Sequence, residues 1–225
     1  MNDTAFPCLF SKRAWGAKTI RVIFCDRRKD GDFSDFLQGI IQYSHFIHST
    51  PLNKRIFAPL VVFFSQDFNT NKSQHETGWE ALKWIHAHDI HPWPSHIATD
   101  PGSADWTFCF NNIQFFINMS TKDHKVLRNR NLGMHLTFVI NARENFDAVA
   151  NGKTKGGRQI REHIRERVKI YNDGAFPQEL GFYGEEDNLE WKQYQLAEEG
   201  VARPHQCPFS SKHKLNSSDE GSKGE

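Results

Sequence analysis

The sequence predicts an α/β protein of the mixed α+β kind: a single mixed sheet flanked by helices, with a central β-hairpin. Two observations support this fold class. In the first ninety residues, short runs rich in β-branched and aromatic residues alternate with longer segments whose apolar residues recur every 3.6 positions. After Pro101 the pattern changes to two strand-like runs joined by an Asn-Asn pair, which is a hairpin signal.

The first strand and helix are predicted in the first fifty residues. Residues 19–25 (TIRVIFC) form a β-branched and aromatic run that ends in a polar cluster, which is typical of a strand followed by a loop. We expect it to be a central strand. From Phe33 to Ile47 the apolar residues fall on one helical face, and Pro51 ends this helix.

A second strand and helix follow. Residues 58–65 (APLVVFFS) are a continuous apolar run of strand length and predict a second buried strand. Thr77 followed by Glu80 matches a capping box, and the apolar stripe behind it predicts a helix that ends near His88.

The predicted hairpin occupies the middle of the chain. Residues 106–110 alternate, Asn111 and Asn112 can take positive φ, and residues 113–119 resume as a strand. On this pattern Trp106, Phe108 and Phe110 share one face of the hairpin.

The rest of the chain completes one domain, predicted to span residues 1–209. Residues 135–141 (HLTFVIN) read as a further strand, and residues 158–171 read as a helix with one apolar face. Residues 177–209 mix aromatic and acidic residues without a clear period. Residues 210–225 are polar and of low complexity, so we expect a disordered tail.

Composition excludes several classes of protein. The 28 Lys and Arg nearly balance the 27 Asp and Glu, so no global field favours nucleic acid as a partner. No apolar run approaches the 18 or so residues of a membrane helix, and the first ten residues do not resemble a signal peptide. We therefore expect a cytoplasmic protein without membrane association. Four cysteines without a CxxC pair predict reduced thiols.

Two charged clusters leave alternatives open. His86, His88 and His91 have a spacing that could hold a metal, but Ile90 stands where an Asp would be expected, so we favour a polar helix end. Residues 158–169 (RQIREHIRERVK) favour a surface helix with Glu–Arg pairs. The alternative is that one or two of these arginines turn inward to grip a carboxylate or propionate.

Six short motifs carry a resemblance to a known family. They are FPC at 6–8, WPSHIATDP at 93–101, WTFCF at 106–110, KDHKVLRNR at 122–130, EWKQY at 190–194 and CPF at 207–209. In this order the chain resembles the YqcI/YcgG family from about residue 6 to residue 209. The resemblance implies a haem-dependent N-oxygenase, because relatives in the cycloserine and guanitoxin pathways hydroxylate nitrogen on amino-acid-derived guanidines.

The resemblance also directs attention to particular residues. Haem iron needs an axial ligand, and the propionates need cationic donors. We expect His124 to be the axial ligand, with Arg128 and Arg130 beside the propionates. On the sequence alone, a surface histidine in a basic loop is the favoured interpretation of His124; with the resemblance, the two interpretations are balanced. Cys207 is the rival ligand and Cys8 a weaker one, although free cysteines beside Pro and Phe are usually small packing residues.

Further residues are assigned to the pocket. Trp106 and Phe108 are expected to form part of a flat apolar wall near His124. Asp100 is expected to act in catalysis by pairing with a cationic substrate nitrogen, although an Asp-Pro step is more often a turn starter. Lys192 and Tyr194 belong to a family motif and are expected to line the pocket.

The resulting expectation is a monooxygenase that binds haem and hydroxylates a nitrogen of an amine or guanidine substrate derived from an amino acid. O₂ is the co-substrate, and electrons come from an external reductant, supplied by a reductase. The alternative is a non-catalytic haem or small-ligand binding protein with the same fold.

Overall fold

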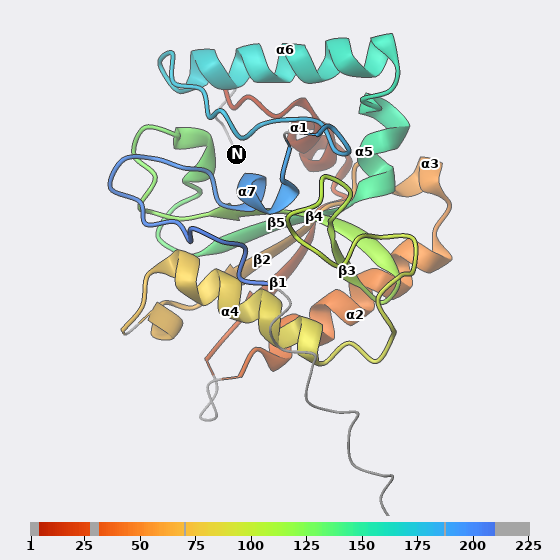
Figure 1. Cartoon of the computed structure of the whole chain (residues 1–225), viewed down its shortest axis with the longest axis vertical. Coiled ribbons are helices and arrows are strands. Elements are labelled where there is room, and N and C mark those ends of the chain that lie inside the picture. Colours follow the sequence, from red (N-terminus) through yellow and green to blue (C-terminus); the bar gives the residue numbers. More distant parts are fainter. Residues whose placement is uncertain (1–4, 28–31, 70, 187, 210–225) are drawn as a thin grey trace, which may run out of the picture.

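A five-stranded mixed sheet organises the protein in the computed structural model, which describes residues 5–27, 32–69, 71–186 and 188–209 (Figure 1). Across the sheet the strands are β1 (Arg21–Cys25), β2 (Leu60–Phe64), β5 (Thr137–Ala142), β4 (Ile113–Ser120) and β3 (Phe108–Phe110). β1 runs parallel to β2, and every other neighbouring pair is antiparallel. The predicted mixed fold class is therefore confirmed, while the predicted tail at 210–225 lies outside the described residues.

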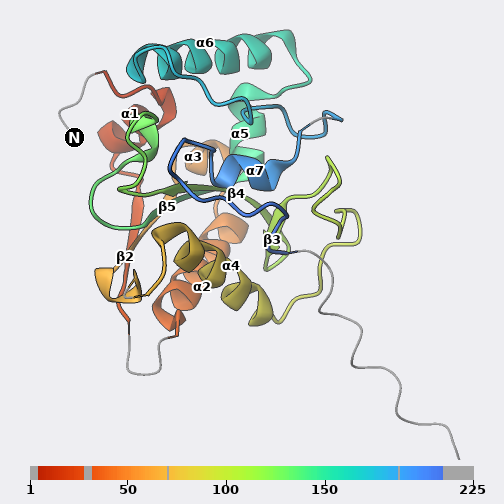
Figure 2. The same ribbon diagram turned by 60° about the vertical axis from the view of Figure 1, so that its left-hand side comes forward.

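Helices cover both faces of this sheet. α2 (Ser34–Ser49) and α4 (Gln74–Ala87) lie on one face, and α5 (Arg143–Ala150), α6 (Lys155–Tyr171) and α7 (Glu190–Tyr194) lie on the other (Figure 2). The shorter helices α1 (Leu9–Ala17) and α3 (Leu52–Arg55) precede β1 and β2 in the chain. α6 is the helix farthest from the sheet on its side.

β1 is an edge strand, so the prediction of a central strand is wrong. Its partner on one side is β2, and no strand in the described part of the chain pairs with its other side. The apolar run at residues 19–25 correctly indicated a strand. It could not indicate position, because a partly exposed edge strand and a buried one can share the same composition.

The capping box of α4 lies one turn earlier than predicted. Ser73 is the N-cap: its hydroxyl accepts from Glu76 N at 3.2 Å, and Ser73 N donates to the Glu76 carboxylate at 2.8 Å. Thr77 instead donates to the carbonyl of Phe68 at 3.5 Å. Both Ser73–Glu76 and Thr77–Glu80 satisfy the S/T-x-x-E pattern, and the structure uses the first.

The hairpin forms as predicted. Asn111 and Asn112 have φ of 51° and 60°, the left-handed conformation that a two-residue hairpin turn of this type requires at both positions. Phe108 pairs with Phe115 across it. β3 is the other edge of the sheet.

Aromatic side chains build much of the core between the sheet and the helices α2 and α4. Phe36 of α2, Phe64 of β2 and Phe138 of β5 are all fully buried, and their ring centroids lie 4.9–5.7 Å apart. Edge-to-face packing of this kind adds stabilisation beyond the burial of apolar area. The nineteen Phe residues therefore supply core volume in a chain whose mean hydropathy is only −0.65.

Candidate functional site

The loop that follows β4 wraps around one carboxylate, that of Glu198. The backbone N–H groups of Lys125, Val126 and Leu127 donate to it at 2.6, 2.9 and 2.9 Å. His124 Nδ1 lies 3.0 Å from the same carboxylate. Burial raises the pKa of Glu198, but these four hydrogen bonds outweigh burial and bring the pKa down to about 2. Glu198 is therefore ionised at neutral pH.

This carboxylate fixes the tautomer of His124. The His124 side chain is fully buried, and burial lowers its pKa more than the hydrogen bond that Glu198 accepts raises it, so the ring is neutral at neutral pH. An ionised carboxylate can only accept, so the single ring proton must lie on Nδ1. Nε2 then keeps a free lone pair. It is buried and has no hydrogen-bond partner in the structure. Such an atom is a ready ligand for a metal ion.

A second buried imidazole lies beside His124. His75, near the start of α4, is 2% exposed, and its ring centroid is 5.3 Å from that of His124. Its Nε2 atom is also buried without a partner. Burial, His124 and Arg130 together lower the pKa of His75 to about 3. The site thus holds two neutral histidines.

Arg130 and Arg128 are held by other groups. Arg130 is 3% exposed and donates to the carbonyls of Gln193 and Tyr194 at 3.0 and 3.4 Å, with Nε buried and unpartnered. Burial lowers the pKa of Arg130 to about 9. Arg128 is half-exposed, contacts Asp173 at 3.2 Å and donates to the carbonyl of Tyr171. The arginine that influences the two histidines is therefore Arg130.

The aromatic wall of the hairpin contacts other segments. Trp106 and Phe108 are buried, and Thr107 and Cys109, which alternate with them, are buried as well. Trp106 packs against Trp93, Tyr194 and Phe209, with ring centroids 5.9–6.3 Å apart, and Phe108 also contacts Phe209. The ring contact of His124 is with His75 of α4.

The two rival cysteines occupy different environments. Cys207 belongs to the core, and burial raises the pKa of its thiol to about 12, so it is a protonated thiol at neutral pH. Cys8 is the N-cap of α1, where its sulfur accepts from Ser11 N at 3.4 Å. The carbonyls of Phe6 and Pro7 accept from Arg167 of α6, so the FPC motif anchors the N-terminal segment.

Asp100 lies on the surface. Its carboxylate accepts from Gly102 N at 2.8 Å, which is the local hydrogen bond of an Asp-Pro turn. No histidine of the His124 site is among its contacts in the described part of the chain.

The EWKQY motif builds a second polar cluster beneath the hairpin. Glu190 is 2% exposed, accepts from the hydroxyl of Thr107 at 2.5 Å and lies 2.7 Å from the hydroxyl of Tyr194. It also forms an ion pair with Arg143. Tyr194 OH in turn accepts from Phe108 N at 3.1 Å. The cluster joins α7 to β3 and to the start of α5.

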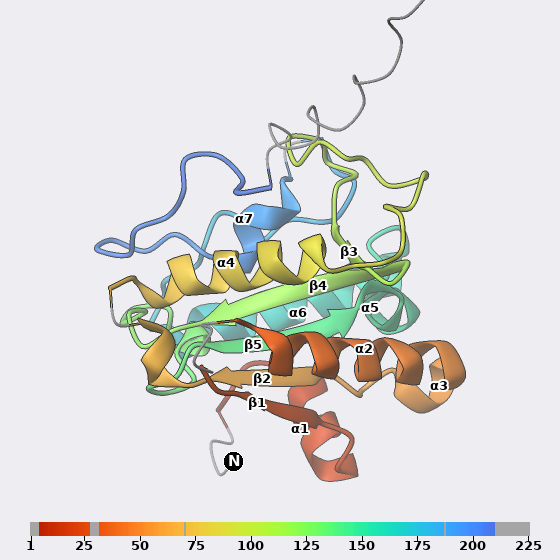
Figure 3. The same cartoon turned by 90° about the horizontal axis from the view of Figure 1, so that it is seen from below.

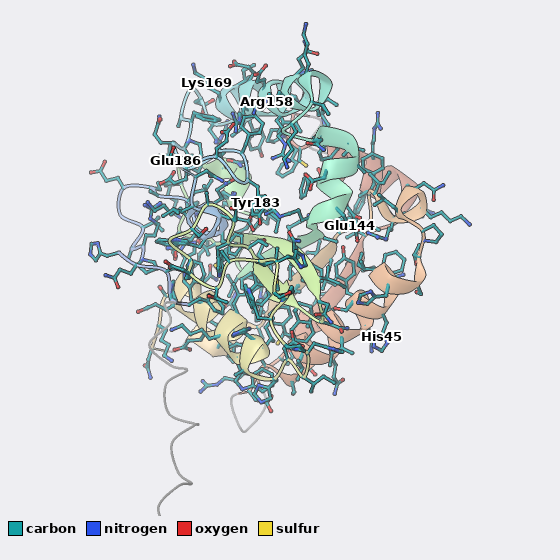
Figure 4. The ribbon with its side chains drawn as sticks, turned by 45° about the vertical axis from the view of Figure 1, so that its right-hand side comes forward. His45, Glu144, Arg158, Lys169, Tyr183 and Glu186 are labelled. Carbon is teal, nitrogen blue, oxygen red and sulfur yellow. The ribbon has the colours of Figure 1, made fainter. Side chains whose placement is uncertain are left out.

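Three arginines of α6 lie against one aromatic ring of the same chain. Arg158, Arg161 and Arg165 place their guanidinium groups 4.7, 5.5 and 4.4 Å from the ring centroid of Phe182. Arg161 also donates to the carbonyl of Ala150 at 2.5 Å. Figure 4 places Arg158 near the segment that carries Tyr183. The cations pack on aromatic rings and on acids of the same chain.

Two hollows of about 440 Å³ each lie apart from the histidines. One has Arg165 in its wall, and the other, at the beginning of β4, has Arg143 and Glu144. The chain reaches His124 from the opposite end of this eight-residue strand, which is roughly 20 Å away at about 3.3 Å per residue. Neither His75 nor His124 lines these hollows, and both histidine side chains are buried.

Sequence reasoning missed His75 and Glu198. His75 lies two residues before the capping box that the sequence predicted at Thr77 and Glu80, and no motif pointed to it. Glu198 lies 74 residues after His124 in a stretch without period. In the described part of the chain, no three His, Cys, Asp or Glu side chains converge as a metal site, including at His86, His88 and His91. No described helix has the length and apolar character needed to span a membrane.

Comparison with known proteins identifies the family. The model of the YqcI/YcgG family matches residues 1–210. The chain belongs to the YqcI/YcgG family. The "Putative N(omega)-hydroxy-L-arginine synthase DcsA" of Streptomyces lavendulae is 39% identical over 213 residues, which cover 93% of this chain and 80% of that protein. The uncharacterised proteins YcgG and YqcI of Bacillus subtilis (strain 168) are 29% and 27% identical, over 91% and 92% of this chain and 81% and 82% of theirs. No solved structure matches the chain significantly.

Proposed function

We propose that this protein is an N-oxygenase that uses haem to hydroxylate a nitrogen of an amine or guanidine substrate derived from an amino acid. The observation that carries the proposal is the unprotonated, buried Nε2 of His124, whose Nδ1 is held by Glu198. The similarity to a protein named as an N(omega)-hydroxy-L-arginine synthase supports the reaction class.

The donor chemistry at His124 fits haem iron. A neutral imidazole that gives its other ring proton to a carboxylate is a more basic ligand with a fixed orientation. Because the His124 side chain is fully buried, a group bound to Nε2 would be enclosed with it and kept from bulk water. When bound, haem would supply the activation of O₂ that oxygen transfer to nitrogen requires, with electrons from an external reductase.

The chain's own residues would tune this site. Glu198 would hold the proton on Nδ1 and so keep Nε2 available for the iron. Burial keeps the pKa of His75 low, so the neighbouring imidazole would stay neutral and add no positive charge beside the iron. Arg130, the nearby buried cation, is the better candidate to face an anionic propionate than Arg128, whose side chain is half-exposed.

Substrate binding is assigned to Asp100. Its carboxylate is exposed and one oxygen is used in a turn, so the second oxygen could accept from a cationic nitrogen. Asp100→Asn keeps the turn hydrogen bond and removes the charge. We expect it to raise the KM for a cationic substrate with little change in haem content, and an unchanged KM would remove Asp100 from the site.

The absorption spectrum of the purified protein tests the cofactor and its ligand together. We expect a haem Soret band, and a ferrous CO complex without the strong red shift that a thiolate ligand causes. His124→Ala should lose haem, whereas Cys207→Ala should keep both the haem and the spectrum. A red-shifted CO complex that disappears in Cys207→Ala would transfer the ligand role to the thiol.

Turnover is tested separately with the haem-loaded protein. With O₂, a reductant and L-arginine or related amines, we expect a product heavier by one oxygen atom, detected by mass spectrometry. A protein that binds haem through His124 but yields no such product with any amine or guanidine would support the non-catalytic alternative.

A further inference from the structure

At the outer edge of β1, no strand of the described residues pairs with the backbone groups. Arg21 N donates to Pro59 O and Ser65 N donates to Cys25 O, both at 2.9 Å, so residues 21, 23 and 25 turn their N–H and C=O groups toward β2. In a parallel pair these groups alternate between the two sides of a strand. The N–H and C=O groups of Val22 and Phe24 therefore face away from the sheet.

The side chains at this edge are apolar and exposed. Val22 is 48% exposed and Phe24 is 71% exposed, the latter stacked on Phe63 of β2 with ring centroids 5.6 Å apart. Edge strands of monomeric proteins are usually protected by Pro, Lys, bulges or a covering segment. The strand RVIFC has no Pro, Gly or Lys, and Arg21 stands at its beginning.

The strand is complementary to itself when two copies run antiparallel. A two-fold axis through Ile23 places Val22 of one copy opposite Phe24 of the other, and both residues have outward N–H and C=O groups. Val22 and Phe24 would then exchange two backbone hydrogen bonds on each side of the axis, which is the narrow pair of an antiparallel ladder. Their apolar side chains would meet on one face of the extended sheet.

The position of α1 fits this arrangement. Trp15 of α1 is 56% exposed, and α1 ends four residues before β1 begins, on the side of the molecule that carries the β1 edge (Figure 3). The antiparallel arrangement brings α1 of one copy toward the end of β1 where Phe24 of the other copy lies.

We propose that β1 is the dimerisation surface of this protein, and that its occupant is β1 of a second copy, joined antiparallel about Ile23 into a continuous ten-stranded sheet. Closed two-fold dimers are the commonest homo-oligomers, and addition of a strand to an exposed edge is a common mode of recognition.

Val22→Pro tests the backbone pairing. Val22 N–H faces away from β2, so proline there leaves the β1–β2 hydrogen bonds intact and removes the hydrogen bonds between copies. Val22→Thr is the matched control, because it keeps the N–H and the branched shape. By sedimentation at about 100 μM, a concentration at which a micromolar dimer is populated, we expect dimers for the unmodified chain and for Val22→Thr. Monomers with unchanged circular dichroism are expected for Val22→Pro.

Cysteine cross-linking tests the register without destabilising the strand. In a narrow antiparallel pair the Cα atoms lie about 5.5 Å apart, within the range of a disulfide. A mixture of Val22→Cys and Phe24→Cys copies should form a disulfide-linked dimer under mild oxidation, and either variant alone should not.

An unmodified chain that sediments as a monomer at that concentration would overturn the proposal. So would a dimer that persists in folded Val22→Pro. Cross-linking of Val22→Cys alone, without cross-linking in the mixture, would refute the register.

Discussion

Replacing Glu198 with Gln removes one negative charge from the most heavily hydrogen-bonded carboxylate of the candidate site. The carboxylate accepts from three backbone N–H groups and from His124. An amide offers a single acceptor oxygen and turns its NH₂ group toward these donors. The substitution keeps the size of the side chain, so the change tests hydrogen bonding and charge separately from packing.

The magnitude follows from the pKa of Glu198, which falls from its ordinary value of 4.5 to about 2 in the folded chain. A difference of about 2.5 pKa units corresponds to about 3 kcal/mol of folding free energy at neutral pH. A carboxyl whose pKa is lower in the folded state stabilises the fold above its unfolded pKa. This stabilisation is lost as the pH falls from 4.5 toward 2.

Urea unfolding followed by tryptophan fluorescence measures this contribution. At pH 7 we expect Glu198→Gln to be less stable than the unmodified chain by about 3 kcal/mol. The difference should shrink as the pH falls below 4.5. Glu199→Gln is the matched control, because Glu199 is the next residue and is exposed. A difference that does not change with pH, or a Glu199→Gln variant that is equally unstable, would refute the reasoning.

The same substitution releases the tautomer of His124. An amide can donate to Nδ1 as well as accept from it, so the ring proton can move to Nε2. If haem is bound through Nε2, we expect Glu198→Gln to weaken haem binding by about 10- to 100-fold, the usual cost of losing such a supporting carboxylate. Haem titration of the folded variant measures this affinity. An unchanged affinity would show that Glu198 does not support His124 as a haem ligand.

Three further predictions concern the polar contacts that hold the fold. Tyr194→Phe removes the hydroxyl that accepts from Phe108 N. It should lower the free energy of unfolding, measured in urea, by about 1–3 kcal/mol. An unchanged free energy of unfolding would contradict the need for this hydroxyl. Arg143→Met leaves the Glu190 carboxylate buried without its cation and should cost about 3–5 kcal/mol. Adding Glu190→Gln should recover part of this, and strictly additive losses would argue against the pair. Ser73→Ala removes the N-cap of α4 and should cost about 1 kcal/mol by thermal unfolding; an unchanged melting temperature would refute the cap.

Local patterns in the sequence were sufficient to predict most elements of the fold. The apolar run of β2, the period of α2 and the Asn-Asn turn of the hairpin depend on interactions between residues close in the chain. α1 was missed because its N-cap is Cys8 and not one of the usual capping residues. α5 was missed because it follows β5 directly, at Arg143, without a turn signal between them.

Which groups meet was decided by the tertiary structure. His124 was singled out by the resemblance, but the carboxylate that fixes its tautomer comes from residue 198. The ring beside it is that of His75, which the sequence did not single out. Likewise the sequence of β1 determined that residues 19–25 form a strand. Its place at the edge depends on where the other four strands pair. Burial and pairing are properties of the assembled chain, because contacts between distant segments create them, and no local period encodes those contacts.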